Sequence, residues 1–139
     1  MYRINEEKVF CDIADGQAVV IDFTTGIYYG FTPLGSEVLE KLRDGSGPED
    51  IFAALQAAGA GESVRADLDG FIGELVRKEI LAGDAAGYSA GTTAIAPRAL
   101  EEGFLLAVQE FNDVQDLLLA DPVHEVDVDM GWPIMKENG

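Results

Sequence analysis

The sequence predicts a winged-helix-like α+β fold, in which a three-stranded antiparallel sheet is followed by three helices, with a C-terminal linker, helix and extended tail. Apolar residues alternate with a period of two over residues 9–31, and they recur at intervals of three or four over residues 34–79. Short segments that contain Gly separate these runs. Because three strands cannot bury their apolar face alone, the helices are expected to cover it.

The three strands are expected at residues 9–14, 18–23 and 27–31. Asp15-Gly16 favours a tight hairpin turn between the first two strands. Thr24-Thr25-Gly26 can turn the chain again, because glycine adopts positive φ without steric cost. Short strands joined by tight turns form an antiparallel meander.

The three helices follow directly. Thr32-Pro33 can open the first helix, and Asp44 to Gly47 end it. The second helix begins at Pro48 and ends before Gly59. The third is expected from about residue 62 to residue 79, with its apolar positions at Val64, Leu68, Phe71, Ile72, Leu75 and Val76. Leu68, Phe71 and Leu75 are expected in the core, and Ile80-Leu81 is expected to pack back on it.

These elements predict a domain over residues 1–82 and a flexible linker over residues 83–97, which are small and rich in Gly. Residues 98–139 are expected to form a helix and an acidic, aromatic tail. The apolar residues with helical spacing there are Leu100, Phe104, Leu105, Val108, Phe111, Val114, Leu117 and Leu118. From Val123 to Val128 apolar and acidic residues alternate, so this stretch could add as a strand to an exposed sheet edge.

The overall charge argues against several classes of partner. The chain has 139 residues, of which 26 are acidic and 9 are basic, and its formal net charge is −17. Such a chain would repel nucleic acid, because binding normally requires Lys and Arg to replace phosphate counterions. Excess acid favours solubility or a basic partner. No apolar run approaches the roughly 20 residues of a membrane helix, and the N-terminus has no apolar signal core, so a cytoplasmic protein is expected.

No catalytic or metal site is predicted. Cys11 is the only cysteine and His124 the only histidine, and they lie far apart in the sequence. A zinc site needs several converging ligands, and a lone cysteine in an alternating strand is typical of a buried, inert thiol. The expected protein is therefore neither an enzyme nor a cofactor or metal carrier.

Several motifs resemble those of the PqqD-like peptide chaperones, also called RiPP recognition elements. Residues 18–35 run Ala-Val-Val-Ile-Asp-Phe-Thr-Thr-Gly-Ile-Tyr-Tyr-Gly-Phe-Thr-Pro-Leu-Gly, and they resemble the family pattern D-x-x-T-G-x-Y-Y/F-x-L-N-x-x-G. Phe31-Thr32 stands where Leu-Asn is more usual. Residues 38–45, 67–75 and 80–81 resemble the family's next helix, last helix and closing segment. The ordered set covers a little over half of the chain.

The resemblance implies that the protein binds the leader segment of a ribosomally made precursor peptide and presents it to a modifying enzyme. In this family the leader adds as a strand to the edge of the three-stranded sheet and lies against the last helix. The expected edge is the third strand, with Ile27, Tyr28, Tyr29, Gly30 and Phe31. Side chains alternate along a strand, so one of its two faces is expected to be core. Gly30 would let a ligand backbone approach closely.

The last helix is expected to form the other wall of this groove. Its candidate residues are Arg65, Asp69, Ile72 and Val76, which share a stripe beside the core positions. Arg65 could pair with acidic leader residues. The tail could be a leader-like ligand of its own groove, a docking element for the enzyme or a completion of the fold, through Val123, Val126, Val128 and Trp132.

Three other functions remain open. A winged-helix regulator needs a basic recognition helix, but the last helix carries Arg65, Arg77 and Lys78 among more numerous acidic residues. A small enzyme would use Cys11 or His124, but no nucleophile–base set is visible. A structural subunit differs from the leading hypothesis only in recognising no peptide. An exposed sheet edge and a long tail also favour a swapped or edge-paired homodimer.

Overall fold

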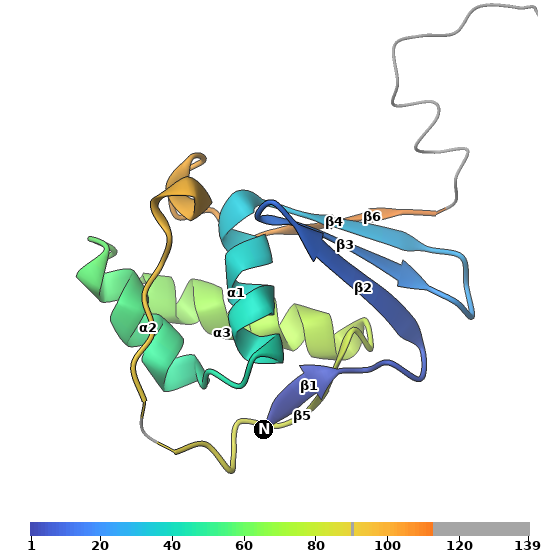
Figure 1. Cartoon of the computed structure of the whole chain (residues 1–139), viewed down its shortest axis with the longest axis horizontal. Helices are drawn as coiled ribbons and strands as arrows, with labels where there is room; N and C mark the ends of the chain where they lie inside the picture. The colour runs from blue at the N-terminus through green and yellow to red at the C-terminus, as the bar shows by residue number, and fades with distance from the viewer. Residues whose placement is uncertain (90, 113–139) are drawn as a thin grey trace, which may run out of the picture.

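The computed structural model describes residues 1–89 and 91–112, which form an α+β domain with two antiparallel sheets and three helices (Figure 1). The larger sheet has four strands in the order β2-β3-β4-β6, and the smaller pairs β1 with β5. The helices gather beside the larger sheet, and β6 runs alongside β4 (Figure 1). In chain order the elements are β1 (Tyr2–Ile4), β2 (Val9–Ala14), β3 (Gln17–Asp22), β4 (Tyr28–Phe31), α1 (Pro33–Arg43), α2 (Pro48–Ala57), α3 (Val64–Arg77), β5 (Leu81–Gly83), the 3-10 helix η1 (Pro97–Leu100) and β6 (Val108–Phe111).

The expected meander is confirmed in strands β2, β3 and β4. In the first hairpin Val9 pairs with Asp22 and Ala14 with Gln17, and in the second Val20 pairs with Tyr29. Asp15 and Gly16 both adopt positive φ in the first turn. These pairings place alternate residues on the face of the sheet that the helices cover.

Asp22 organises the turn that leads into β4. Its carboxylate accepts hydrogen bonds from the Thr24 amide (2.8 Å), the Thr24 hydroxyl (2.7 Å) and the Thr25 amide (3.2 Å). Lys8 lies 3.4 Å from its other oxygen. Burial would raise the pKa of Asp22, but the hydrogen bonds from Thr24 and Thr25 and the charge of Lys8 together lower it below its ordinary value. The Asp and Thr-Gly of the motif thus fix the approach to β4.

The three helices and the core also agree with the sequence prediction. Thr32 caps α1 by accepting a hydrogen bond from the Gly35 amide (3.0 Å), and Pro33 occupies the first turn. Leu68, Phe71 and Leu75 are buried, as expected, and so are Ile80 and Leu81. They join one apolar core whose largest fully buried side chains include Leu34, Leu39, Leu42, Ile51, Leu55, Val9, Val20 and Val38.

Two expectations are wrong. The larger sheet has four strands rather than three, and a second sheet pairs the two ends of the domain, with Arg3 opposite Ala82. The helix expected within residues 98–112 does not form, since η1 ends at Leu100 and β6 begins at Val108. Gly103 takes a φ of +74° between them, which ends the helical path. Backbone hydrogen bonds to the edge of β4 then stabilise residues 108–111 as a strand. This stabilisation exceeds their weak preference for a helix.

The segment between β5 and η1 contacts the domain at several points. The Tyr2 amide donates to the Tyr88 hydroxyl (2.8 Å), Lys41 donates to the Thr93 hydroxyl (2.9 Å), and the Ala96 amide donates to buried Glu37 (2.8 Å). The flexibility of residues 83–97 and the domain boundaries at 82 and 97 stay predictions. Of the helices within the described ranges, none combines the length and hydropathy that crossing a bilayer requires.

Candidate functional site

The edge of β4, where the sequence predicts peptide addition, is occupied by another segment of the same chain. β6 pairs antiparallel with the whole of β4, and its register places Phe31 opposite Val108 and Tyr28 opposite Phe111. The third strand of the meander is therefore not an open edge. An extended segment does add as an antiparallel strand to β4, as strand addition requires. That segment is residues 108–111 of the same chain.

Alternation along β4 assigns its two faces. Tyr29 and Phe31 are buried in the core, and the Phe31 ring meets the Phe71 ring of α3 edge to face, with 6.2 Å between centroids. Tyr28 and Gly30 lie on the opposite face and are half-buried, as is Ile27 just before the strand. The core face of β4 thus points toward α3.

The same alternation orients β6. Val108 and Glu110 stand opposite Phe31 and Tyr29, so they share the face that points toward α3. Val108 packs against the core. Phe111 lies on the other face, where its ring is 3.7 Å from the Cβ position of an alanine at residue 30. The Phe111 ring thus packs over Gly30 on the outer face, where an added Cβ would make an ordinary van der Waals contact with it.

Thr32 joins the start of α1 to the segment that leads into β6. Its hydroxyl donates to the Leu105 carbonyl (2.8 Å) and accepts from the Ala107 amide (3.3 Å), in addition to capping α1. Its amide donates to the Ala107 carbonyl at 3.2 Å. One donor and two acceptor positions of the hydroxyl are all used, which fixes where the added strand begins.

Gly35 permits the close approach of this segment. A Cβ on residue 35 would lie 3.0 Å from the Thr32 hydroxyl, 3.1 Å from the Ala107 carbonyl oxygen and 3.2 Å from the Phe71 ring. All three neighbours lie at the occupied edge of β4. The Gly of the family motif therefore has a steric role at the beginning of the occupied edge.

Lys78, at the C-terminal end of α3, holds the far end of β6. Its ammonium lies 3.1 Å from a Glu110 carboxylate oxygen, 3.2 Å from Glu74 and 5.6 Å from the centroid of the Tyr29 ring. Burial would lower the pKa of Lys78, but hydrogen bonds to Glu110 and Glu74 raise it above its ordinary value. Lys78 therefore stays charged at neutral pH. Its ammonium is placed to form an ion pair with a carboxylate of an added strand.

Both faces of the β4–β6 pair are flanked by hollows. One, of about 490 Å³, lies between α3 and the segment that precedes β6; α3 contributes Gly70, Phe71 and Glu74 to its lining. The other, of about 470 Å³, lies along Gly30, Thr32 and Phe111. Phe104 and Leu105, before β6, are 36% and 53% exposed. An added strand therefore has room for large side chains on either face.

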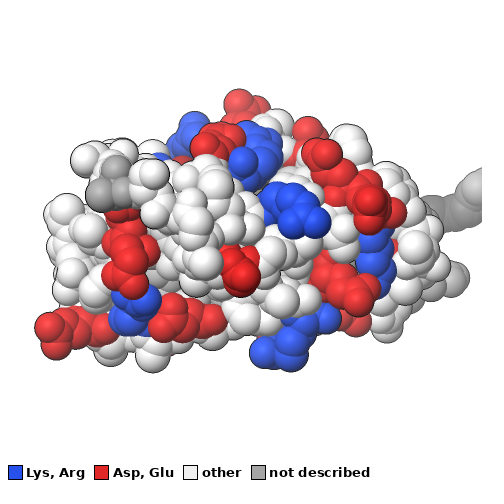
Figure 2. Space-filling model, turned by 90° about the horizontal axis from the view of Figure 1, so that it is seen from below, with Lys and Arg blue, Asp and Glu red and all other residues white. Residues whose placement is uncertain are grey.

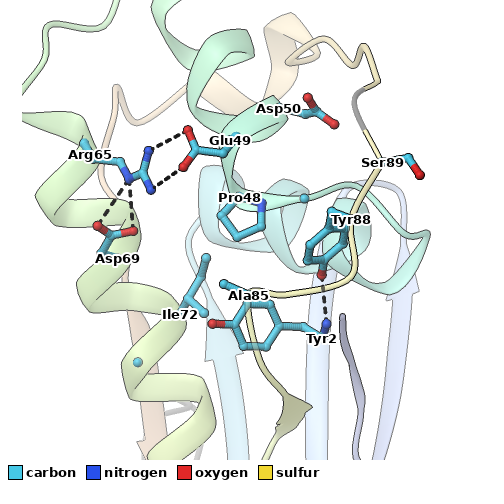
Figure 3. A pocket seen from close by; sticks show the side chains of 12 residues that line it. Tyr2, Pro48, Glu49, Asp50, Arg65, Asp69, Ile72, Ala85, Tyr88 and Ser89 are labelled. Carbon is cyan, nitrogen blue, oxygen red and sulfur yellow. Dashed lines mark hydrogen bonds and ion pairs between the residues drawn. The ribbon is translucent and has the colours of Figure 1, made fainter.

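The α3 residues predicted for the groove lie elsewhere. Arg65, Asp69 and Ile72 line a third cavity, of about 530 Å³, together with the start of α2 and the segment after β5. Arg65 makes a two-pronged ion pair with Glu49 (2.8 and 3.0 Å) and also contacts Asp69 at 3.2 Å (Figure 3). The structure does not bring these residues to the edge of β4. Val76 is 37% exposed and does not line that cavity.

Two tyrosines, Tyr2 and Tyr88, line this third cavity. Tyr88 lies beside Pro48 in the lining of the cavity, and its hydroxyl accepts from the Tyr2 amide (Figure 3). A Cβ on Gly47 would lie 2.9 Å from the Tyr88 ring, so the segment after β5 fits closely there. The cavity is a junction between the smaller sheet and the helices, and Arg65 is already neutralised within it.

Basic side chains elsewhere are also paired with carboxylates. Lys8 contacts Asp22 and Glu79, and Arg77 contacts Glu74. On the face drawn in Figure 2, the basic side chains lie among acidic ones and form no continuous basic surface. This arrangement gives no support to nucleic-acid binding through α3.

The residues considered for chemistry form no site within residues 1–89 and 91–112. No group of three potential metal ligands occurs there. Burial raises the pKa of the half-buried Cys11 thiol, which disfavours the reactive thiolate. His124 and the tail residues Val123, Val126, Val128 and Trp132 lie outside the described residues.

Sequence reasoning did not assign four parts of the occupied edge to the peptide site: β6, Thr32, Gly35 and the stripe formed by Phe71 and Glu74 of α3 with Lys78 directly after it. Two signals pointed to them. Thr32 departs from the usual Asn of the motif, and Lys78 belongs to the only adjacent basic pair of the chain. Neither signal alone indicates a contact with residues 105–110.

Comparison with known proteins agrees with this fold. The family described as "Coenzyme PQQ synthesis protein D (PqqD)" matches residues 17–81. Among curated proteins the chain has no match. A solved structure described as "TbiB1 in Complex with the TbiA(beta) Leader Peptide" is 32% identical, covers 60% of this chain and 98% of its own, and superposes with a TM-score of 0.53. The β6 strand lies outside the residues matched by the family. On these matches, together with the Asp22 turn, the capped α1 and the strand order, the chain belongs to the PqqD family.

Proposed function

We propose that this protein is a RiPP recognition element that binds the leader segment of a precursor peptide as an antiparallel strand on β4. The observation that carries the proposal is the complete pairing of β4 with an added strand beside α3. The edge therefore has the spacing, the apolar wall and the charged end that an extended peptide needs. The solved relative is in complex with a leader peptide, which supports a leader peptide as the ligand proposed for this chain.

Two kinds of interaction would bind the leader. Backbone hydrogen bonds along β4 would hold any extended peptide, and side-chain positions would select among peptides. Phe31 and Phe71 offer an apolar surface to one face of the strand, and Lys78 offers a cation near its end. The groove residues proposed here on α3 are therefore Phe71, Glu74 and Lys78, in place of Arg65, Asp69 and Ile72.

The protein is proposed to act without catalysis, by presenting the bound leader to a peptide-modifying enzyme. Binding by strand addition leaves the remainder of a precursor peptide outside the groove, where an enzyme can reach it. Cytoplasmic location, a homodimeric state and a peptide-modifying enzyme as partner stay predictions.

The proposal can be tested by selecting displayed random peptides of about ten residues on the full chain and mapping them by amide hydrogen exchange. Bound peptides are expected to increase protection in β4 and in the C-terminal half of α3. Protection confined to the cavity beside Arg65 would place the site elsewhere. Selection of no peptide, by the wild type or by a variant in which β6 is loosened, would refute leader binding.

Adjacent cations provide a matched pair of variants. Lys78→Glu is expected to weaken binding of an acidic peptide at least about tenfold, because a charged hydrogen bond contributes roughly 1.5–3 kcal/mol. Arg77→Glu makes the same charge change at the preceding residue, where the side chain is 70% exposed and contacts only Glu74 among the ion pairs described. Its effect is expected to stay within about threefold.

A further inference from the structure

The placement of β6 raises the question of how an external peptide could reach β4. Every residue of β4 already has a partner in β6. An incoming strand cannot pair with the same backbone groups while β6 remains. Since the family match ends at residue 81, this occupying strand belongs to the part of the chain added beyond the family domain.

We propose that residues 104–111 are a resident substitute for the leader peptide, which an external leader must displace and whose side-chain pattern it shares. This inference rests on the proposed function and describes its regulation and specificity. Three contacts of the segment have the character of ligand contacts: the Thr32 clasp on Leu105 and Ala107, the Lys78–Glu110 ion pair, and Phe111 beside Gly30.

The segment leaves much of its side-chain surface in solvent, so its departure would expose little further core. Val108 is only half-buried, and Gln109 and Glu110 are exposed, whereas the facing residues Tyr29 and Phe31 are buried. Phe104 and Leu105 leave much of their apolar surface in solvent next to the hollow along α3. The β2–β3–β4 meander keeps its own core when β6 leaves, because the fully buried side chains come from β2, β3, the helices and the segment at Ile80–Leu81.

The contacts of β6 also specify the peptide that would replace it. An apolar side chain is required opposite Phe31, and a carboxylate two residues later opposite Tyr29, within reach of Lys78. An aromatic side chain follows on the outer face beside Gly30. The ligand class is therefore a leader that contains an apolar residue, any residue, Asp or Glu, and an aromatic residue in succession.

The segment would act as an intramolecular competitor. A short tether gives it an effective concentration on the order of millimolar. If its intrinsic dissociation constant is about a tenth of that concentration, β4 is open about a tenth of the time, and external peptides bind about tenfold more weakly than to an open site. Leaders with the apolar, acidic and aromatic side chains at the three matching positions would bind tightly enough to displace β6. Peptides that match these positions poorly would not displace it.

The test uses full-length variants and a fluorescent synthetic peptide with the sequence of residues 103–112. Gln109→Pro with Glu110→Lys should release β6, because proline removes a backbone donor and lysine faces Lys78. Gly30→Cys with Gln109→Cys should lock it through a disulfide between paired residues, which reducing agent opens. Asp12→Lys, which changes charge by the same amount on exposed β2, is the control for the released variant.

Fluorescence anisotropy is expected to show probe binding to the released variant at least about tenfold tighter than to the wild type or to Asp12→Lys. The oxidised lock should bind the probe at least about tenfold more weakly than its reduced form. A probe in which the residue equivalent to Glu110 is lysine should lose affinity for the released variant. Circular dichroism verifies folding, and the reversible lock provides a second measurement if the released variant does not fold.

Equal probe affinity for the wild type, the released variant and the oxidised lock would overturn the inference. So would an external leader that binds the wild type while the amides of β6 keep their protection from exchange. Neither result would refute leader binding itself. Failure of every selected leader to bind the released variant would refute the proposed function, even if the probe made from this chain binds.

Discussion

The Thr32 hydroxyl donates a hydrogen bond to the Leu105 carbonyl, 2.8 Å away and 73 positions later in the sequence. The same oxygen caps α1, so the start of the first helix and the start of the added strand depend on one side chain. A residue that sequence reasoning treats as a helix signal is thus also the clasp that positions β6 on β4.

Thr32→Ala is expected to lower the free energy of unfolding by about 1 kcal/mol, because the Gly35 amide loses its cap. It should also accelerate amide exchange in β6 more than in β2, because the hydroxyl contacts the segment that leads into β6 and makes no hydrogen bond to β2 among those described. Thr32→Ser keeps the hydroxyl and is the matched control. Equal exchange rates in the Ala and Ser variants would show that the hydroxyl does not hold the strand.

Gly35→Ala is expected to destabilise the protein by roughly 1–3 kcal/mol, since the new Cβ would crowd Thr32, Ala107 and Phe71. Gly73→Ala is the control within α3, where the nearest atom to a new Cβ is a flexible Arg77 nitrogen at 3.8 Å. That change should stabilise the helix by about 0.5–1 kcal/mol. Urea denaturation measures both, and stabilisation by both variants would contradict a steric role for Gly35.

Asp22→Asn is expected to lower the free energy of unfolding by roughly 1–3 kcal/mol near neutral pH, because the turn loses hydrogen bonds to a charged acceptor. The pKa of Asp22 is lower in the folded state, so the unfolded state binds more protons and stability rises with pH in this range. The contribution is complete above the ordinary pKa of 3.8 and is lost as the pH falls through the lower folded-state pKa.

Urea denaturation at a series of acidic pH values checks this prediction. The difference in unfolding free energy between the wild type and Asp22→Asn should shrink as the pH falls below about 4. Asp12→Asn, at an exposed position of β2, should differ from the wild type by less than about 0.5 kcal/mol. A difference for Asp22→Asn that does not change with pH would contradict the assigned pKa shift.

Arg65→Gln separates the two candidate surfaces of α3. Arg65 is bound to Glu49 and Asp69 at the third cavity, away from β4, so its loss should leave the affinity of a β4-bound peptide unchanged within about twofold. Fluorescence titration with the same peptide used for Lys78→Glu provides the comparison. A loss as large as that caused by Lys78→Glu would return Arg65 to the peptide site.

The meander, the three helices, their core positions and the family could all be predicted from the amino-acid sequence. Each depends on local information: the two-residue period of residues 9–23, the turn at Asp22 to Gly26, and the apolar spacing from Leu68 to Leu75. Such patterns depend on residues close together in the sequence, so they can be interpreted without knowing the long-range contacts. The role of strand addition followed from the family, and it stays a proposal for this chain.

The segment that occupies the edge of β4, and the stripe of α3 that faces this edge, could not be predicted from the sequence because both depend on long-range contacts. The apolar residues from Leu100 to Phe111 fit a helix by spacing, but unpaired backbone groups on β4 favour a strand at Val108–Phe111. The period of α3 identifies its buried stripe, yet both flanking stripes, at Arg65 and at Lys78, are equally compatible with it. Long-range hydrogen bonds and side-chain packing determine which segment pairs with β4 and which stripe of α3 faces it. A local sequence pattern does not indicate which distant segment will pack there.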